Sequence, residues 1–138
     1  MKVVIDTNVL VASLRSRRGA SFKLLSLLPR KKFSIAISVP LVFEYEDALK
    51  CLESSAIKDQ DREDLIDFLC KIGHHQKIFF LWRPFLPDPA DDHVLEVAAA
   101  AGCNAIVTYN KRDFKGIEKF GIRVLDPKEF LSEIGVIK

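Results

Sequence analysis

The start of this chain places a carboxylate directly after a short apolar strand. Residues 3–5 (Val-Val-Ile) form a β-branched run that is too short for a helix and typical of a strand buried on both faces. The run stops at Asp6, and Thr7 or Asn8 is then expected to cap a short apolar helix that reaches Leu14. Asp6 is therefore expected at the carboxyl end of the first strand, the edge at which open α/β sheets bind ligands.

Two roles are open for Asp6 at this position. A carboxylate just past an apolar strand is desolvated on one side, so it needs a cation, a metal ion or hydrogen-bond donors. In the simpler case Asp6 only organises the strand-to-helix turn. In the other case it binds a ligand at the edge of the sheet, and its position alone favours neither role.

The rest of the chain alternates apolar runs with amphipathic segments. We expect strands over residues 33–38, 78–82, 104–108 and 122–125, with His74 and His75 in a loop. We expect helices over residues 20–28, 39–52, 61–72, 91–101 and 127–134, the second capped by Ser38 and the others ended by Pro29, Gly73, Gly102 and Gly135. This alternation predicts an α/β fold with a mainly parallel central sheet and helices on both faces. The length of 138 residues favours a single domain over 1–138.

Charge is divided unevenly along the chain, although the net charge is only +2. Residues 7–43 contain seven basic residues and no acidic ones, whereas residues 44–67 contain nine acids and three bases. A basic side and an acidic side are therefore expected. The basic positions considered for binding a nucleic-acid backbone are Arg15, Arg17, Arg18, Arg30, Lys31 and Lys32, and a solvated surface is an equally good interpretation of them.

The three cysteines, Cys51, Cys70 and Cys103, lie far apart and form no Cys-x-x-Cys pair. This spacing argues against a zinc site or a disulfide framework and favours reduced thiols in a cytoplasmic protein. Asp6 interrupts the first apolar run, so no secretory signal is expected. No apolar stretch approaches the ~20 residues that span a bilayer, so no membrane partner is expected.

Several acids follow predicted strands or open a predicted helix. They are Asp6, Glu44, the group Asp88, Asp91 and Asp92, and Asp113 with the amide Asn110. In a parallel sheet these positions converge on one edge, where three or four carboxylates would repel one another unless Mg²⁺ or Mn²⁺ lay between them. Oxygen ligands alone favour these ions over zinc, and such a site suits hydrolysis of phosphodiesters. Helix capping explains Asp88 fully, but it does not require three acids together.

Four segments together resemble the PIN-domain ribonucleases. The opening Val-Val-Ile-Asp-Thr-Asn-Val-Leu resembles the first motif of that family, and Ser38–Leu49 resembles the second. Asp88-Pro-Ala-Asp-Asp, with Ala98 seven residues after Asp91, resembles the third, and Ile106–Phe114 resembles the fourth. The motifs occur in order over nearly the whole chain. The subgroup they resemble most is that of short toxin components of toxin–antitoxin pairs.

This resemblance implies a Rossmann-like fold and Mg²⁺- or Mn²⁺-dependent cleavage of RNA. It also implies a homodimer and inhibition by a small antitoxin. The catalytic residues implied are Asp6, Glu44, Asp91 and Asp113, with Asp6 and Asp91 binding metal and Asn8, Asp92, Thr108 and Asn110 supporting them. The chain departs from the pattern at Asn110, where the family often has an acid. Asp91 fits the metal-binding aspartate better than Asp92, which is expected to face solvent or to contact the ligands.

Two other functions remain open. A non-catalytic RNA-binding or regulatory protein could keep the same fold. A phosphatase with Asp6 as nucleophile is the other alternative, but phosphatases of that kind usually carry a second acid where this chain has Asn8. Metal-dependent turnover of single-stranded RNA separates the nuclease from the first alternative, and an aspartyl-phosphate at Asp6 would support the second.

Overall fold

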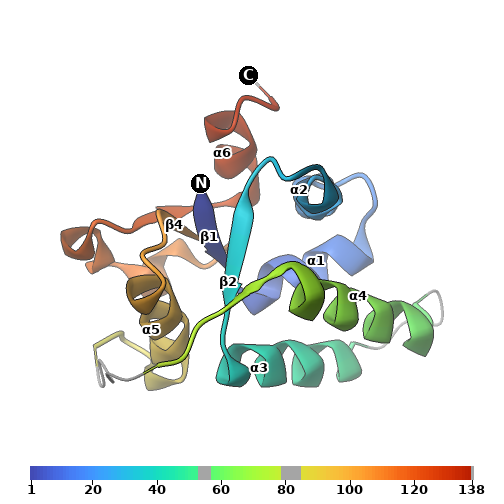
Figure 1. Ribbon diagram of the computed structural model, residues 1–138, viewed down its shortest axis with the longest axis horizontal. Coiled ribbons are helices and arrows are strands. Elements are labelled where there is room, and N and C mark those ends of the chain that lie inside the picture. The colour runs from blue at the N-terminus through green and yellow to red at the C-terminus, as the bar shows by residue number, and fades with distance from the viewer. Residues whose placement is uncertain (53–56, 79–84, 138) are drawn as a thin grey trace.

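The computed structural model describes residues 1–52, 57–78 and 85–137, and in them five strands form one parallel sheet. The strand order is β3-β2-β1-β4-β5. Figure 1 labels the central strand β1 with its neighbours β2 and β4. The strands are β1 (Lys2–Ile5), β2 (Ser34–Ile37), β3 (His74–His75), β4 (Ala105–Val107) and β5 (Arg123–Leu125). The predicted parallel α/β fold is confirmed.

Helices cover both sides of the sheet, with α5 on one side and α1, α2 and α4 on the other (Figure 1). The α-helices are α1 (Thr7–Arg15), α2 (Ala20–Ser26), α3 (Val39–Lys50), α4 (Asp59–Ile72), α5 (Asp92–Ala100) and α6 (Pro127–Glu133). The 3₁₀ helices are η1 (Leu28–Arg30), η2 (Pro89–Asp91), η3 (Lys111–Phe114) and η4 (Ile117–Phe120). Within the described ranges, no helix has both the length and the apolar character to span a bilayer.

The central strand β1 is buried on both faces, as its β-branched sequence predicts. Val3 and Val4 are fully buried, and Ile5 is paired with Val107 of β4 in parallel register. The backbone N–H of Asp6 continues this ladder by donating to the Val107 carbonyl at 2.9 Å. The residues that follow β1 and β4 therefore lie side by side at the carboxyl edge of the sheet.

The first helix begins one residue earlier than expected. Asp6 itself is the N-cap of α1, and its Oδ1 accepts a 2.9 Å hydrogen bond from the backbone N–H of Thr7. The prediction of Thr7 or Asn8 as the cap was therefore wrong, because Asp6 is both the last extended residue and a good capping side chain. Ser38, by contrast, caps α3 as predicted, accepting from the Leu41 N–H.

The edge strand next to β2 differs from the prediction. His74 and His75, expected in a loop, pair with Ala36 and Ile37 as β3, and the following N–H of Gln76 donates to the Ile37 carbonyl. The strand expected at 78–82 falls mainly on residues outside the described ranges, and Ile78 itself is not in a strand. An exposed edge strand is held by backbone hydrogen bonds, so its side chains need not be apolar. The two histidines of β3 therefore lack the hydrophobic pattern by which a strand is predicted.

Two helices end for structural reasons that differ from the predicted ones. Helix α2 ends at Ser26, and Pro29 lies inside η1 rather than ending α2. Gly73 follows α4 with φ of −75°, so it is not a left-handed cap. A Cβ there would lie 2.8 Å from the Leu69 carbonyl oxygen and 3.1 Å from the Ile37 side chain, so close packing against β2 accounts for this glycine.

Candidate active site

Asp6 is tied to the end of β4 by a buried hydrogen-bond network. The Thr108 hydroxyl donates to Asp6 Oδ2 at 2.8 Å, and the Asn8 amide donates to the same oxygen at 3.2 Å. Asp6 is 6% exposed and Thr108 is fully buried. Thr108 and Asn8, both predicted as supporting residues, therefore orient this carboxylate.

Asn8 also links the end of β1 to the end of β4 through further hydrogen bonds. Its Oδ1 accepts from the backbone N–H of Tyr109, and its Nδ2 also donates to the Thr108 hydroxyl. That hydroxyl accepts a further bond from the backbone N–H of Asn110. These hydrogen bonds of Asn8 and Thr108 hold the loop after β4 against the start of α1.

Burial raises the pKa of Asp6, because the charged form loses hydration next to the core. The hydrogen bonds from Thr108 and the Thr7 backbone act in the opposite direction, and the charge of Glu44 raises the pKa further. The pKa of Asp6 is therefore raised overall even though three donors serve its carboxylate.

Glu44 on α3 is brought to the site together with two residues that the sequence analysis did not select. His93 Nε2, on α5, lies 2.6 Å from Glu44 Oε2 at ion-pair distance. Tyr45 is buried, and its hydroxyl donates to the Ile5 carbonyl at the end of β1. The available sequence signals were the position of His93 two residues after Asp91 and that of Tyr45 next to Glu44.

Asp91 lies among the other acids of the edge. Partial burial and the charge of Asp6 raise its pKa to about 6, and the charges of Asp88, Asp113 and Glu44 raise it as well. Like charges act in this way only at short range, since water and salt screen them beyond about 10 Å. The acids that act on the pKa of Asp91 therefore come from four separate segments of the chain.

The two acids that flank Asp91 have structural partners. Asp88 caps η2 and accepts a 2.9 Å hydrogen bond from the Ala90 N–H, as predicted. Asp92 is fully buried and accepts from the backbone N–H groups of Leu86, at 2.9 Å, and Phe85. Of the two expectations for Asp92, that it faces solvent is wrong, because the loop before η2 folds back over it. That it contacts the metal ligands stays a prediction.

The positions of these side chains can be compared with what a bound metal ion requires. Within the described ranges, no three His, Cys, Asp or Glu side chains stand close enough to hold one ion together. The donor set at the edge nevertheless consists of carboxylates, with the Thr7 hydroxyl buried and without a hydrogen-bond partner in the described structure. Oxygen donors and unrelieved carboxylate repulsion fit a hard divalent cation.

The basic residues predicted for RNA binding fall into two separate groups. Arg15 ends α1, and Arg17 and Arg18 lie in the exposed loop that leads to α2. Lys31 and Lys32 line a hollow with Met1, at the amino-terminal edge of the sheet, and Arg30 precedes them. The second group is therefore at the opposite edge from the carboxylates.

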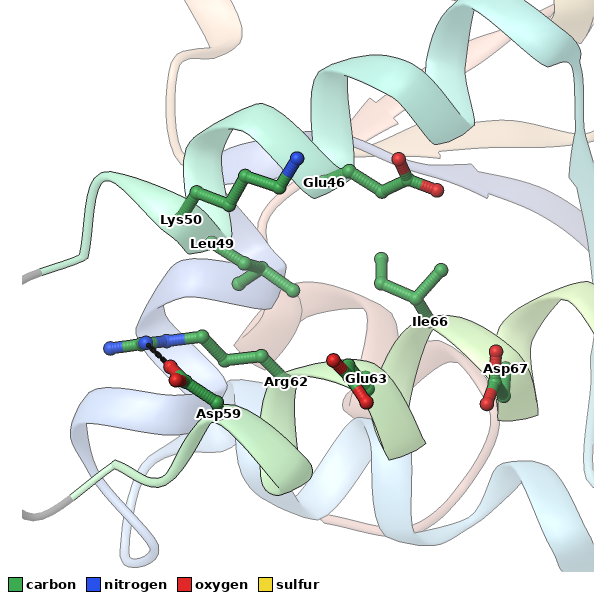
Figure 2. A pocket seen from close by; sticks show the side chains of 8 residues that line it. All are labelled: Glu46, Leu49, Lys50, Asp59, Arg62, Glu63, Ile66 and Asp67. Carbon is green, nitrogen blue, oxygen red and sulfur yellow. Dashed lines mark hydrogen bonds and ion pairs between the residues drawn. The ribbon is translucent and has the colours of Figure 1, made fainter.

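A groove of about 500 Å³ runs between α3 and α4. Figure 2 shows Leu49 and Ile66 facing into it, and Arg62 paired with Asp59 at 2.7 Å at one end. The remaining lining residues are Glu46, Lys50, Glu63 and Asp67. None of the predicted catalytic carboxylates lines this groove.

The family model of the PIN domain matches residues 2–112 of this chain. The chain belongs to the PIN-domain family. The matched region contains β1, α3, α5 and β4, which position Asp6, Glu44, Asp91 and Thr108. PIN domains are generally nucleases that use divalent metal ions. A search of curated proteins found no match to this PIN domain.

Two solved structures share the fold of this PIN domain. The crystal structure of VapBC2 from Rickettsia felis, bound to a DNA fragment from its promoter, has a TM-score of 0.64 at 20% identity and covers 91% of this chain and 100% of its own. The crystal structure of FitAcB from Neisseria gonorrhoeae has a TM-score of 0.55 at 14% identity, covering 91% and 98%. At these identities the likeness concerns the fold.

Proposed function

We propose that this PIN domain is a Mg²⁺- or Mn²⁺-dependent endoribonuclease. The observation that supports it is the arrangement at the carboxyl edge of the parallel sheet. Asp6 directly follows β1, Glu44 of α3 lies 2.6 Å from His93 of α5, and the charges of Asp6 and Glu44 raise the pKa of Asp91. Acids that serve only as helix caps have no reason to lie near acids of other segments. A metal-dependent phosphodiester nuclease uses carboxylates of this kind to bind its divalent cation.

The residues have distinct roles in this proposal. Asp6 and Asp91 hold the cation, and Glu44 and Asp113 contribute charge beside them. When bound, the cation supplies charge neutralisation at the phosphate and acidifies a water molecule. Thr108 and Asn8 keep Asp6 aimed at the edge through hydrogen bonds of 2.8 and 3.2 Å. His93 holds Glu44 in place through the 2.6 Å contact between Nε2 and Oε2.

The test is cleavage of labelled single-stranded RNA with Mg²⁺ or Mn²⁺ added, and with the cation removed by chelation. We expect cleavage by the parent protein only with the cation, and none by Asp91→Asn. Asp61→Asn is a matched control, because Asp61 is an exposed acid near the start of another helix, α4. This control is expected to cleave RNA like the parent.

Other outcomes would contradict the nuclease proposal. RNA binding without turnover under every cation would favour a non-catalytic RNA-binding protein. A trapped aspartyl-phosphate at Asp6 would favour the phosphatase. Equal cleavage by Asp91→Asn and the parent would show that Asp91 does not belong to the catalytic group.

We further propose that the protein is a toxin that a small antitoxin inhibits, and that it forms a homodimer. The resemblance of the four motifs to short PIN toxins and the fold shared with VapBC2 and FitAcB support this proposal. Expression of the parent should arrest growth, and expression of Asp91→Asn should not. Rescue by the product of a short neighbouring reading frame would identify the antitoxin, and light scattering measures the oligomeric state.

A further inference from the structure

Tyr109 is an exposed aromatic residue at the carboxylate edge, held at both ends. Its backbone N–H donates to Asn8 Oδ1 at 3.1 Å, and its hydroxyl shares a 2.6 Å hydrogen bond with the Ser21 hydroxyl of α2. Ser21 is 1% exposed, whereas Tyr109 is 48% exposed. The phenol oxygen is thus engaged with a buried partner, although nearly half of the surface of Tyr109 is exposed.

This arrangement is unusual for an exposed aromatic side chain. A tyrosine on the surface normally keeps its hydroxyl in water and its ring against the protein. Here the hydroxyl bonds to the buried Ser21 while the residue stays 48% exposed, so neither core packing nor solvation of the hydroxyl explains the orientation. The hydrogen bond of the hydroxyl also restricts the rotation of the side chain, so stacking of a ligand on the ring costs little of that freedom.

The position of the ring connects it with both the acids and the basic loop. Tyr109 directly follows Thr108, and Asn8 bonds to both Tyr109 and the Asp6 carboxylate. On the other side, Ser21 lies three residues after Arg18 in the exposed basic loop. Tyr109 therefore contacts, on one side, a residue bonded to Asp6 and, on the other, the helix that follows the basic loop, whose arginines suit a phosphate backbone.

We propose that the Tyr109 ring is a stacking subsite for one nucleobase of single-stranded RNA. The inference rests on the proposed nuclease function and assigns part of its substrate site. Stacking on an aromatic ring tolerates any base, because every base offers a π-face. The subsite therefore contributes affinity and position and does not select a base.

The experiment measures binding of a fluorescent eight-nucleotide RNA, in chelating buffer, to proteins that carry Asp91→Asn and do not cleave. Tyr109→Ala is expected to weaken binding about tenfold, the size of effect measured for loss of one stacked base. Tyr109→Phe keeps the ring and should stay within about threefold of the parent. An oligomer of the same charge that lacks bases should bind all three proteins equally.

Phe22→Ala is the matched control, since Phe22 is 41% exposed on the same helix as Ser21. It should leave RNA affinity unchanged, and Tyr109→Leu, which keeps apolar bulk, should lose as much as Tyr109→Ala. Equal loss in Phe22→Ala, or equal loss with the base-free oligomer, would overturn the subsite. Unchanged RNA binding in Tyr109→Ala, with weakened self-association or protein binding, would overturn it in favour of a protein contact.

Cleavage assays of the parent and of Tyr109→Ala, both with Asp91 intact, separate the two proposals when they are added to the binding data. A parent that cleaves RNA, with Tyr109→Ala matching it in KM and in the affinity measured in the Asp91→Asn background, overturns the stacking subsite and leaves the nuclease intact. A parent that neither binds nor cleaves RNA overturns both.

Discussion

The Thr108 hydroxyl donates a 2.8 Å hydrogen bond to the Asp6 carboxylate, joining two residues that lie 102 positions apart in the chain. Parallel pairing of β1 with β4 produces this contact, because Ile5 stands opposite Val107 and the next residues continue side by side. The Thr108 oxygen also accepts from Asn8 and from the Asn110 N–H. One buried hydroxyl therefore links three of the sequence-predicted site positions.

Replacement of this hydroxyl should destabilise the protein. Thr108→Val keeps the shape of the side chain but leaves the buried Asp6 carboxylate without one donor and the Asn110 N–H without its acceptor. We expect the free energy of unfolding to fall by about 1–3 kcal/mol in urea denaturation. Thr108→Ser should recover most of that loss, and a Val variant as stable as the parent would contradict a role for the network.

Asp91 should make stability fall with rising pH. Partial burial and the Asp6 charge raise its pKa to about 6 from the ordinary value of 3.8. Between these pH values the unfolded chain binds fewer protons than the folded one, so the free energy of unfolding decreases from about pH 4 to pH 6 and stays lower above it. Asp91→Asn should be more stable than the parent at pH 7.5 by about 1 kcal/mol, well below the full linkage value because Asp91 is partly exposed.

Melting curves across pH 4–8 check this prediction. The stability difference between Asp91→Asn and the parent should disappear toward pH 4, where Asp91 is protonated in both states. Added Mg²⁺ should raise the melting temperature of the parent, because a ligand that binds only the folded state stabilises it. The same Mg²⁺ should leave Asp91→Asn unchanged, and a shift of equal size in both would remove Asp91 from the metal site.

Asp92 and Asp88 should differ in their contribution to stability. Asp92→Ala leaves the N–H groups of Leu86 and Phe85 without their buried acceptor, so we expect a loss of about 2–3 kcal/mol. Asp88→Ala removes only an exposed cap, at a cost of roughly 0.5–1 kcal/mol. Chemical denaturation of both variants is the measurement. A larger loss for Asp88→Ala would reverse this assignment.

The salt dependence of RNA binding should separate the two basic groups. If Arg17 and Arg18 contact phosphates, Gln substitutions there should reduce the slope of log affinity against log salt by about one unit per lost contact. Lys31→Gln with Lys32→Gln is the matched control, because these residues lie at the opposite edge of the sheet. An unchanged slope in both double variants would mean that the basic loop is only a solvated surface.

Local sequence patterns predicted most of the elements because their causes are local. The β-branched run of β1, the Ser38 cap of α3 and the apolar spacing of α4 each act within a few residues. The edge strand β3 escaped prediction because His74 and His75 pair through their backbone with β2, a partner more than 30 residues away. His93 escaped for the same reason, since only the packing of α5 against α3 places it beside Glu44.

Asp91 and Asp92 show where local sequence patterns stop predicting the site and tertiary packing decides. Both are acids at the start of one helix, where local rules favour either side chain equally. The sequence by itself determined that acids would gather at the carboxyl edge, because strand–helix alternation dictates a parallel sheet. Only the tertiary structure turned Asp92 inward, onto the amides of Leu86 and Phe85, and left Asp91 among the other carboxylates. The physical reason is that adjacent residues on a helix point about 100° apart, so the packed loop satisfies one carboxylate and the other faces the edge.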